Sequence, residues 1–321
     1  MANLLVVSGY WPCRNNPISG IFVAEQIRAF ADLGHKVWVI VGQTVGRGRD
    51  LVSLEDVGLD PRSVTLLSPR WIRFPERISH LPAAFRRNTL NMGTCVTRTL
   101  GHLQASGVEF HGALAHDLRY AISSASIWGP DLDRPIIGLV HGVDPVLSRG
   151  SLDRSVIELL RSGSEQLEYL GLVGSFLRTH LADIGLDAER FQIVLNGTQI
   201  PPTFQTHNFL QSDGEKKILS VGRLIEWKGN DDTLRALARL SHEEGLSDWS
   251  FRIIGDGEQR EPLQALAIEL GISEKVDFAG RLDRAQTLAA FDECDVFCLP
   301  SWAEAFGIVF LEAMARGRPV I

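Results

Sequence analysis

The chain has few cysteines, and it has no run of apolar residues long enough to span a bilayer. Its 321 residues include four cysteines, and Cys294-x3-Cys298 has no second pair that would complete a zinc site, so we expect neither a disulfide framework nor a metal. A membrane span needs about 18–20 consecutive apolar residues, and none occurs. No basic leader precedes the first apolar run, Leu4–Val7, which therefore predicts a strand and not a signal peptide. These absences favour a cytoplasmic protein.

A strongly basic composition is also missing. The net charge is -7, because residues 1–200 contain 19 Lys+Arg and 19 Asp+Glu while the remainder contains 13 and 20. This balance argues against general nucleic-acid binding. The hydrophobic share of 45% and the charged share of 22% are those of a globular protein long enough for two domains.

Two common ligand-binding patterns are incomplete. Gly255-x-Gly257 is followed by Arg260 where a dinucleotide-binding fingerprint has its third glycine. Asp131-x-Asp133 lies among glycine and proline residues, and we interpret it as a turn and not as a cation site. We therefore expect no cofactor and no metal ion.

Short apolar runs alternate with segments of helical periodicity in both halves of the chain. This order predicts βαβ units and parallel sheets. We expect an α/β protein with two Rossmann-like, doubly wound domains, at residues 1–199 and 216–321. The prolines and polar residues of 200–215 indicate a linker between them.

Arginine is concentrated in residues 61–98, which contain seven arginines and a single acidic residue. Within 69–98 the arginines alternate with tryptophan and phenylalanine. One interpretation is a surface that contacts an anionic membrane or a lipid acceptor, with Arg86 and Arg87 on phosphate groups. The alternative is an ordinary loop and helix whose arginine stems pack on the surface.

His141 follows the apolar run that ends at Val140. Ligands of parallel α/β sheets bind beyond the carboxyl ends of the strands, so His141 is placed for a functional role. A buried structural histidine is the alternative.

Two carboxylates stand eight positions apart near the end of the chain, at Glu304 and Glu312. We expect a strand over 295–300, a loop, and a helix over 306–316. One carboxylate would accept from hydroxyls of a sugar and the other from hydroxyls of a ribose, with Phe306 and Gly307 offering backbone N–H groups to a diphosphate between them. The alternative is two solvated glutamates at the ends of an amphipathic helix.

This segment resembles the signature of the retaining glycosyltransferases of family 4 (GT4), which have the GT-B fold. The residues that carry the resemblance are Pro300-Ser-x-x-Glu-x-Phe-Gly-x-Val-x-Leu-Glu-Ala-Met-Ala-x-Gly-x-Pro-Val320. In that family two Rossmann-like domains face each other across a cleft, the first glutamate contacts the donor sugar, and the second binds the ribose. Ala305 departs from the glycine that many members have.

Other segments carry the same resemblance. Val-Gly-Arg223-Leu-x3-Lys228-Gly is similar to the family's diphosphate-binding element, which implies that Arg223 and Lys228 stabilise the leaving diphosphate. Gly20, in Ser19-Gly20 where many members have Gly-Gly, corresponds to the glycine loop over the donor phosphate. Gly255 corresponds to a turn near the base, and His141 to a histidine beside the reacting sugar.

The resemblance implies a metal-independent enzyme that transfers a sugar, with retention, from a nucleoside-diphosphate sugar to a hydroxyl acceptor. The acceptor would be a saccharide or a lipid-linked molecule, in bacterial-type envelope or exopolysaccharide synthesis, and the enzyme would be cytoplasmic or peripheral on the inner face of the membrane. Family members continue beyond the position of Ile321, so we expect an incomplete C-terminal domain. A sugar-nucleotide epimerase of the same fold and a non-catalytic sugar-nucleotide-binding protein remain alternatives.

Overall fold

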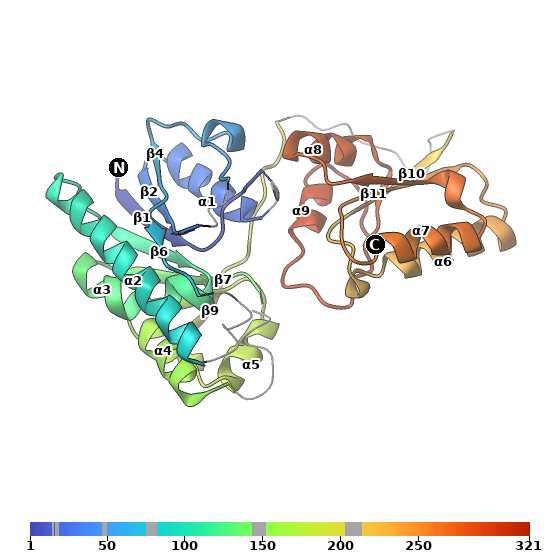
Figure 1. Ribbon diagram of the computed structural model, residues 1–321. Coiled ribbons are helices and arrows are strands. Elements are labelled where there is room, and N and C mark those ends of the chain that lie inside the picture. The colour runs from blue at the N-terminus through green and yellow to red at the C-terminus, as the bar shows by residue number, and fades with distance from the viewer. Residues whose placement is uncertain (15, 17–18, 47–49, 75–81, 143–151, 203–213) are drawn as a thin grey trace. The chain divides into compact units, whose positions relative to one another are not determined.

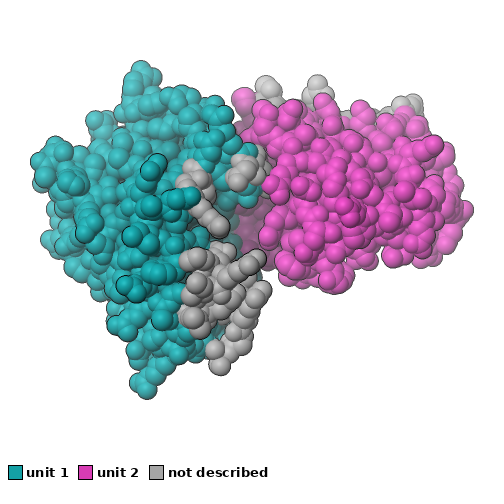
Figure 2. Space-filling view, in the orientation of Figure 1, with its two compact units in different colours: residues 1–196 teal, residues 197–321 magenta. Residues whose placement is uncertain are grey.

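The computed structural model describes residues 1–321 except 15, 17–18, 47–49, 75–81, 143–151 and 203–213 (Figure 1). The chain divides into two compact units, residues 1–196 and residues 197–321 (Figure 2). Most of the expected linker, 200–215, lies outside the described residues. No helix in the described part of the chain combines the length and the hydropathy needed to cross a membrane.

The first unit is built on a seven-stranded parallel sheet with the order β4-β2-β1-β6-β7-β8-β9. Its strands are β1 (Asn3–Ser8), β2 (Lys36–Val41), β4 (Val64–Leu67), β6 (Gly112–His116), β7 (Ile136–Val140), β8 (Tyr169–Leu172) and β9 (Phe191–Ile193); β3 (Gln43–Thr44) pairs separately with β5 (Arg70–Trp71). The chain moves from β1 outward to β4 and returns to β6 on the other side of β1. The topological switch point therefore lies between β1 and β6.

Helices cover both faces of this sheet. They are α1 (Ile21–Asp32), α2 (Pro82–Ala105), α3 (Ala125–Leu132), α4 (Arg154–Ser164) and α5 (Phe176–Asp183), with the short turns η1 (Glu55–Val57), η2 (Leu118–Ile122) and η3 (Ala188–Arg190). Figure 1 shows α2, α3 and α4 side by side. Leu5, Val6 and Val7 of β1 are fully buried, as expected for a central strand covered on both faces.

The second unit has a four-stranded parallel sheet with the order β12-β11-β10-β13. Its elements are β10 (Lys216–Val221), η4 (Glu226–Lys228), α6 (Asn230–Glu243), β11 (Trp249–Ile254), α7 (Arg260–Glu269), η5 (Ser273–Lys275), β12 (Val276–Gly280), α8 (Arg284–Glu293), β13 (Val296–Phe297) and α9 (Ile308–Met314). The switch point lies between β10 and β13. After α9, Val320 makes one parallel bridge with Phe297.

Side chains of the second sheet alternate between two cores. Phe251 and Ile253 pack with residues of α6 and α7, whereas Leu219 and Ile254 pack with Phe291 and other residues of α8 and α9. The alternation follows from the two-residue period of a strand. The prediction of Rossmann-like, doubly wound α/β folding is confirmed for both units.

The helical segment that follows β6 is interrupted. Residues 118–122 form a π-helical turn, and α3 begins only at Ala125. Ser123 and Ser124 stand between them, and the Ser123 hydroxyl donates to the carbonyl of Arg119. Serine side chains that bond to the backbone compete with regular helical hydrogen bonding, which explains the break. Asp131 belongs to α3, so it lies in a helix and not in the predicted turn.

The aromatic residues of the arginine-rich segment pack mostly inside the first unit. Trp71 is 7% exposed and Phe85 is 3% exposed. The Arg87 guanidinium lies over the ring of Phe74, 5.2 Å from its centroid. Pro82 begins a 24-residue helix, where its missing N–H costs nothing. Contact with a membrane stays a prediction.

Candidate functional site

The loops that follow β10 and β13 meet at the switch point of the second unit. Arg223 is exposed just beyond β10, and Lys228 ends the η4 turn. The Lys228 amine contacts a carboxylate oxygen of Glu304, and the Ser301 hydroxyl donates to the same oxygen over 3.4 Å. The lysine side chain is 14% exposed and the glutamate side chain 24% exposed. A cation and a carboxylate that are 76 positions apart therefore share one partly buried site at the strand ends.

Backbone contacts hold these two loops together. The N–H of Trp302 donates to the carbonyl of Trp227 over 2.9 Å. Gly229 has φ 67°, and a Cβ at this position would overlap the carbonyl oxygen of Pro300. Glycine is needed here because it tolerates both the left-handed backbone and the close approach. The contacts fix the segment of Lys228 against the segment that leads to Glu304.

The two carboxylates, Glu304 and Glu312, differ in secondary structure and in burial. Glu304 lies in the loop, and α9 begins at Ile308, two residues later than expected, with Gly307 as its N-cap at φ 76°. Glu312 lies within α9, is 3% exposed, and forms an ion pair with Arg284 of α8. The alternative of two solvated glutamates is therefore wrong. That the backbone N–H groups of Phe306 and Gly307 face a diphosphate stays a prediction.

Gly255 and Gly257 let two strand exits cross at close range. A Cβ on Gly255, whose φ is 144°, would overlap the carbonyl oxygen of Gly222, and one on Gly257 would overlap that of Leu224. This crossing sets the course of the chain on either side of Arg223. Close packing thus explains why residues 255 and 257 are glycine. A contact of Gly255 with a donor stays a prediction.

Two histidines meet at the strand ends of the first unit. His141 follows β7 and His116 ends β6, and His116 Nδ1 lies 2.9 Å from His141 Nε2. The ring of His141 also packs on Phe22, with centroids 4.2 Å apart. His116 was not predicted as a site residue, although it stands at the carboxyl end of a strand as His141 does.

Burial keeps this histidine pair uncharged. It lowers the pKa of His141 to about 4, against a smaller opposing effect of a hydrogen bond with Asn196. Burial also lowers the pKa of His116, and the neighbouring His141 lowers it further. Both rings are therefore neutral near pH 7, where one nitrogen of each can donate and the other can accept a hydrogen bond.

Asp117 is a second residue at this switch point that was not predicted from the sequence. Its backbone has φ 90° and ψ 137°, a strained conformation for a residue other than glycine. The carboxylate accepts from Tyr120 N at 2.7 Å and Ala121 N at 3.2 Å, and its other oxygen accepts from Gly9 N at 2.7 Å. Asp117 thereby joins the exits of β1 and β6 at the switch point.

Gly20 begins α1 at φ 75° and is buried. A Cβ there would lie 2.6 Å from the backbone nitrogen of Trp11. Close packing of two chain segments therefore explains this glycine without a ligand. Its expected place over a donor phosphate stays a prediction.

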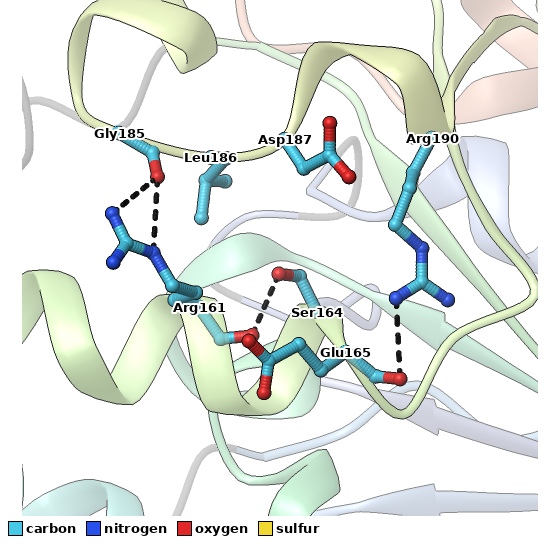
Figure 3. Close-up of a pocket in the computed structure, with 7 residues that line it drawn as sticks. All are labelled: Arg161, Ser164, Glu165, Gly185, Leu186, Asp187 and Arg190. Atoms are coloured by element: carbon cyan, nitrogen blue, oxygen red, sulfur yellow. Dashed lines mark hydrogen bonds between the residues drawn. The ribbon is translucent and has the colours of Figure 1, made fainter.

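A pocket of about 350 Å³ lies near the β9 edge of the first sheet, beside the turns that lead into β8 and β9 (Figure 3). Arg161 donates to the carbonyl of Gly185, and Arg190 donates to the carbonyls of Glu165 and Leu167. Both guanidinium groups thus hold main-chain turns together. None of the predicted site residues lines this pocket.

Metal-ligating side chains are not clustered in the described ranges. No group of three or more His, Cys, Asp or Glu residues there is arranged to hold a metal ion. All four cysteines are free thiols. Burial raises the pKa of Cys294 to about 11, so that thiol stays protonated.

Acidification should destabilise the first unit through His141. Because its folded-state pKa of about 4 lies below the ordinary value of 6.5, the unfolded chain takes up the proton first as the pH falls. The stabilising contribution is complete above pH 6.5 and is lost towards pH 4, with a loss on the order of 2 kcal/mol at pH 5. Urea unfolding of wild type and His141→Phe at pH 7.5 and pH 5 measures it. The variant should lose less stability than wild type, and parallel losses would contradict the assignment.

Comparison with known proteins finds a family that the second unit resembles. The model of "Glycosyl transferases group 1" matches residues 203–321. The chain is 40% identical over 104 residues to the lipopolysaccharide core biosynthesis glycosyltransferase LpsE of Rhizobium meliloti. That alignment covers 32% of this chain and 28% of LpsE. It is 24% identical over 338 residues to the MMP alpha-(1->4)-mannosyltransferase of Mycolicibacterium hassiacum. That alignment covers 94% of this chain and 76% of the mannosyltransferase.

The alignments with three of the curated relatives cover 33%, 27% and 28% of their length, so the chain spans about a third of these proteins. Among solved structures, Anabaena HepE in complex with UDP-glucose has a TM-score of 0.65 at 20% identity, covering 100% of this chain and 80% of that one. At that identity the likeness shows the fold. Residues 203–321 therefore resemble the group 1 glycosyl transferases, and the chain has the Rossmann-like α/β architecture of the GT-B fold.

Proposed function

We propose that the protein transfers a sugar from a nucleoside-diphosphate sugar to a hydroxyl acceptor with retention of anomeric configuration. The observation that carries the proposal is the contact of Lys228 with Glu304 at the switch point of the second unit. A cation for phosphate and an acceptor for sugar hydroxyls stand together there. The relatives named above act as glycosyltransferases or, in the case of HepE, were solved with UDP-glucose.

The chemistry assigns a role to each residue. As the bond from the anomeric carbon to the diphosphate breaks, its electron pair stays on the phosphate oxygen, and Arg223 and Lys228 stabilise that charge without a metal ion. The acceptor oxygen forms the new bond on the same face, and its proton passes to the leaving phosphate. Glu304 orients the sugar, and Glu312 binds the ribose.

The remaining residues assist binding. Backbone amides of Phe306 and Gly307 approach the diphosphate, and the segments of Gly20 and Gly255 border the donor. His141 borders the anomeric centre as a neutral ring, so it adds no charge beside a positively charged transition state.

The proposed acceptor is a saccharide or a lipid-linked molecule of a bacterial-type envelope or exopolysaccharide. LpsE, by its name, acts in lipopolysaccharide core biosynthesis, which supports this choice. Arg86 and Arg87 would bind phosphate groups of a lipid carrier, and the enzyme would work in the cytoplasm at the inner face of the membrane.

Calorimetric titration with UDP, GDP and ADP, with and without magnesium, tests the donor class. We expect one of them to bind without magnesium, and sugars of that nucleotide should then be turned over only when an acceptor is present. Turnover of the donor alone would indicate an epimerase. Binding without any turnover, unchanged in Glu304→Ala, would indicate a sugar-nucleotide-binding protein.

A further inference from the structure

The glutamate proposed to bind ribose is almost completely buried, and a basic residue from another helix reaches it. The Glu312 side chain is 4% exposed and pairs with Arg284, whose side chain is 27% exposed. A buried carboxylate is stable only when a cation and hydrogen bonds replace its lost hydration. Arg284 supplies that cation from α8, 28 positions earlier in the chain.

Arg284 stands at a well-defined place because the start of α8 is fixed. Asp283 accepts from Gln286 N over 2.8 Å, and the Gln286 side chain accepts from Asp283 N over 3.2 Å. This capping box sets where the first residue of the helix lies. The packing of α8 and α9 around Phe291 and Ala313 then fixes the two helices against each other.

A second arginine near Glu312, Arg316, has other partners. Arg316 lies one helical turn after Glu312, but it donates to the main-chain carbonyl of Glu312 and not to its carboxylate. Its Nε lies 3.2 Å from a carboxylate oxygen of Asp292. Arg284 is therefore the arginine whose guanidinium meets the Glu312 carboxylate.

We propose that Arg284 is a positioning residue that orients the Glu312 carboxylate to accept a hydrogen bond from a ribose hydroxyl of the donor. This inference rests on the proposed function, and it adds a residue outside the motif that carries the two glutamates. It makes discrimination between ribose and 2′-deoxyribose depend on Arg284, although Arg284 need not touch the nucleotide.

The test compares dissociation constants for UDP, GDP and ADP with those for their 2′-deoxy counterparts. Wild type should prefer the ribonucleotide by about tenfold, the effect of one charge-assisted hydrogen bond. In Arg284→Met the ribonucleotide affinity should fall to that of the deoxy form, while the deoxy affinity stays nearly constant. A purely structural role would weaken both nucleotides equally.

Two further variants make the result decisive. Arg284→Lys keeps the charge without the two-pronged guanidinium, so it should fold and retain less than half of the wild-type preference. Arg252→Met breaks a pair with Asp277 between neighbouring strands and should leave the preference unchanged.

The outcomes separate the two proposals. If wild type binds none of the nucleotides, the proposed function fails and this inference fails with it. If wild type binds them without a preference for ribose, or if Arg284→Met or Arg284→Lys retains the full preference, only the role of Arg284 is overturned.

Discussion

Replacing Lys228 by methionine should lower the turnover number at least tenfold, equivalent to about 1.4 kcal/mol of lost transition-state stabilisation. Methionine keeps much of the apolar stem and removes the charge that is proposed to stabilise the leaving diphosphate. It also leaves Glu304 without the amine that contacts it, so an unpaired carboxylate would face the incoming phosphate. Initial rates with the donor identified by titration measure the effect, and Arg223→Ala should produce a loss of similar size.

A suitable control is Arg239→Met, which removes an exposed cation of the same unit. Arg239 pairs with Glu243 on the surface of α6, where an exposed ion pair contributes little. Turnover of this variant should match wild type. Near-normal turnover of both Lys228→Met and Arg223→Ala would remove these residues from the proposed mechanism.

Gly255→Ala should destabilise the second unit by about 2–6 kcal/mol, the sum of backbone strain and steric overlap. The φ of 144° is a conformation that side chains rarely adopt, and the new Cβ would overlap the carbonyl oxygen of Gly222. The exits of β10 and β11 would have to separate, which would also displace Arg223. Thermal unfolding, together with hydrogen exchange of the β10 and β11 amides, measures the loss.

Gly271→Ala separates the two causes. Gly271 has φ 68°, and a Cβ there would meet no atom within 4 Å apart from those of its chain neighbours. This variant should therefore lose only about 1 kcal/mol through left-handed strain. Equal losses at both positions would show that the overlap with the Gly222 carbonyl adds nothing to the cost of backbone strain.

Much of the fold follows from local sequence patterns. Buried strands such as Leu4–Val7 appear as short apolar runs, because both faces of a parallel sheet are covered. The ends of elements were harder to predict: β13 has two residues where six were expected, and α9 starts at Ile308. Gly307 is the N-cap of this helix at φ 76°, and a Cβ there would overlap the ring of Phe310, so the boundary depends on packing within the helix as well as on spacing.

The candidate site was predictable where it depends on strand ends and spacing. His141 was selected by its place at the end of a strand, whereas Arg223 and Lys228 were selected by a motif that resembles the diphosphate-binding element of the family. The partners of these residues come from distant segments, so no local pattern could indicate that Arg284 meets Glu312 or that His116 meets His141. Asp117 was missed because its function in the fold depends on a rare backbone conformation.

The joined loops of the second unit have a consequence for motion. Between the loop after β10 and the loop after β13 there are a backbone hydrogen bond, a glycine packed on Pro300, and the ion pair of Lys228 with Glu304. Segments tied at several points tend to open as one cooperative unit. The two loops are thus expected to fluctuate together, so that a ligand that orders one of them also reduces the conformational entropy of the other.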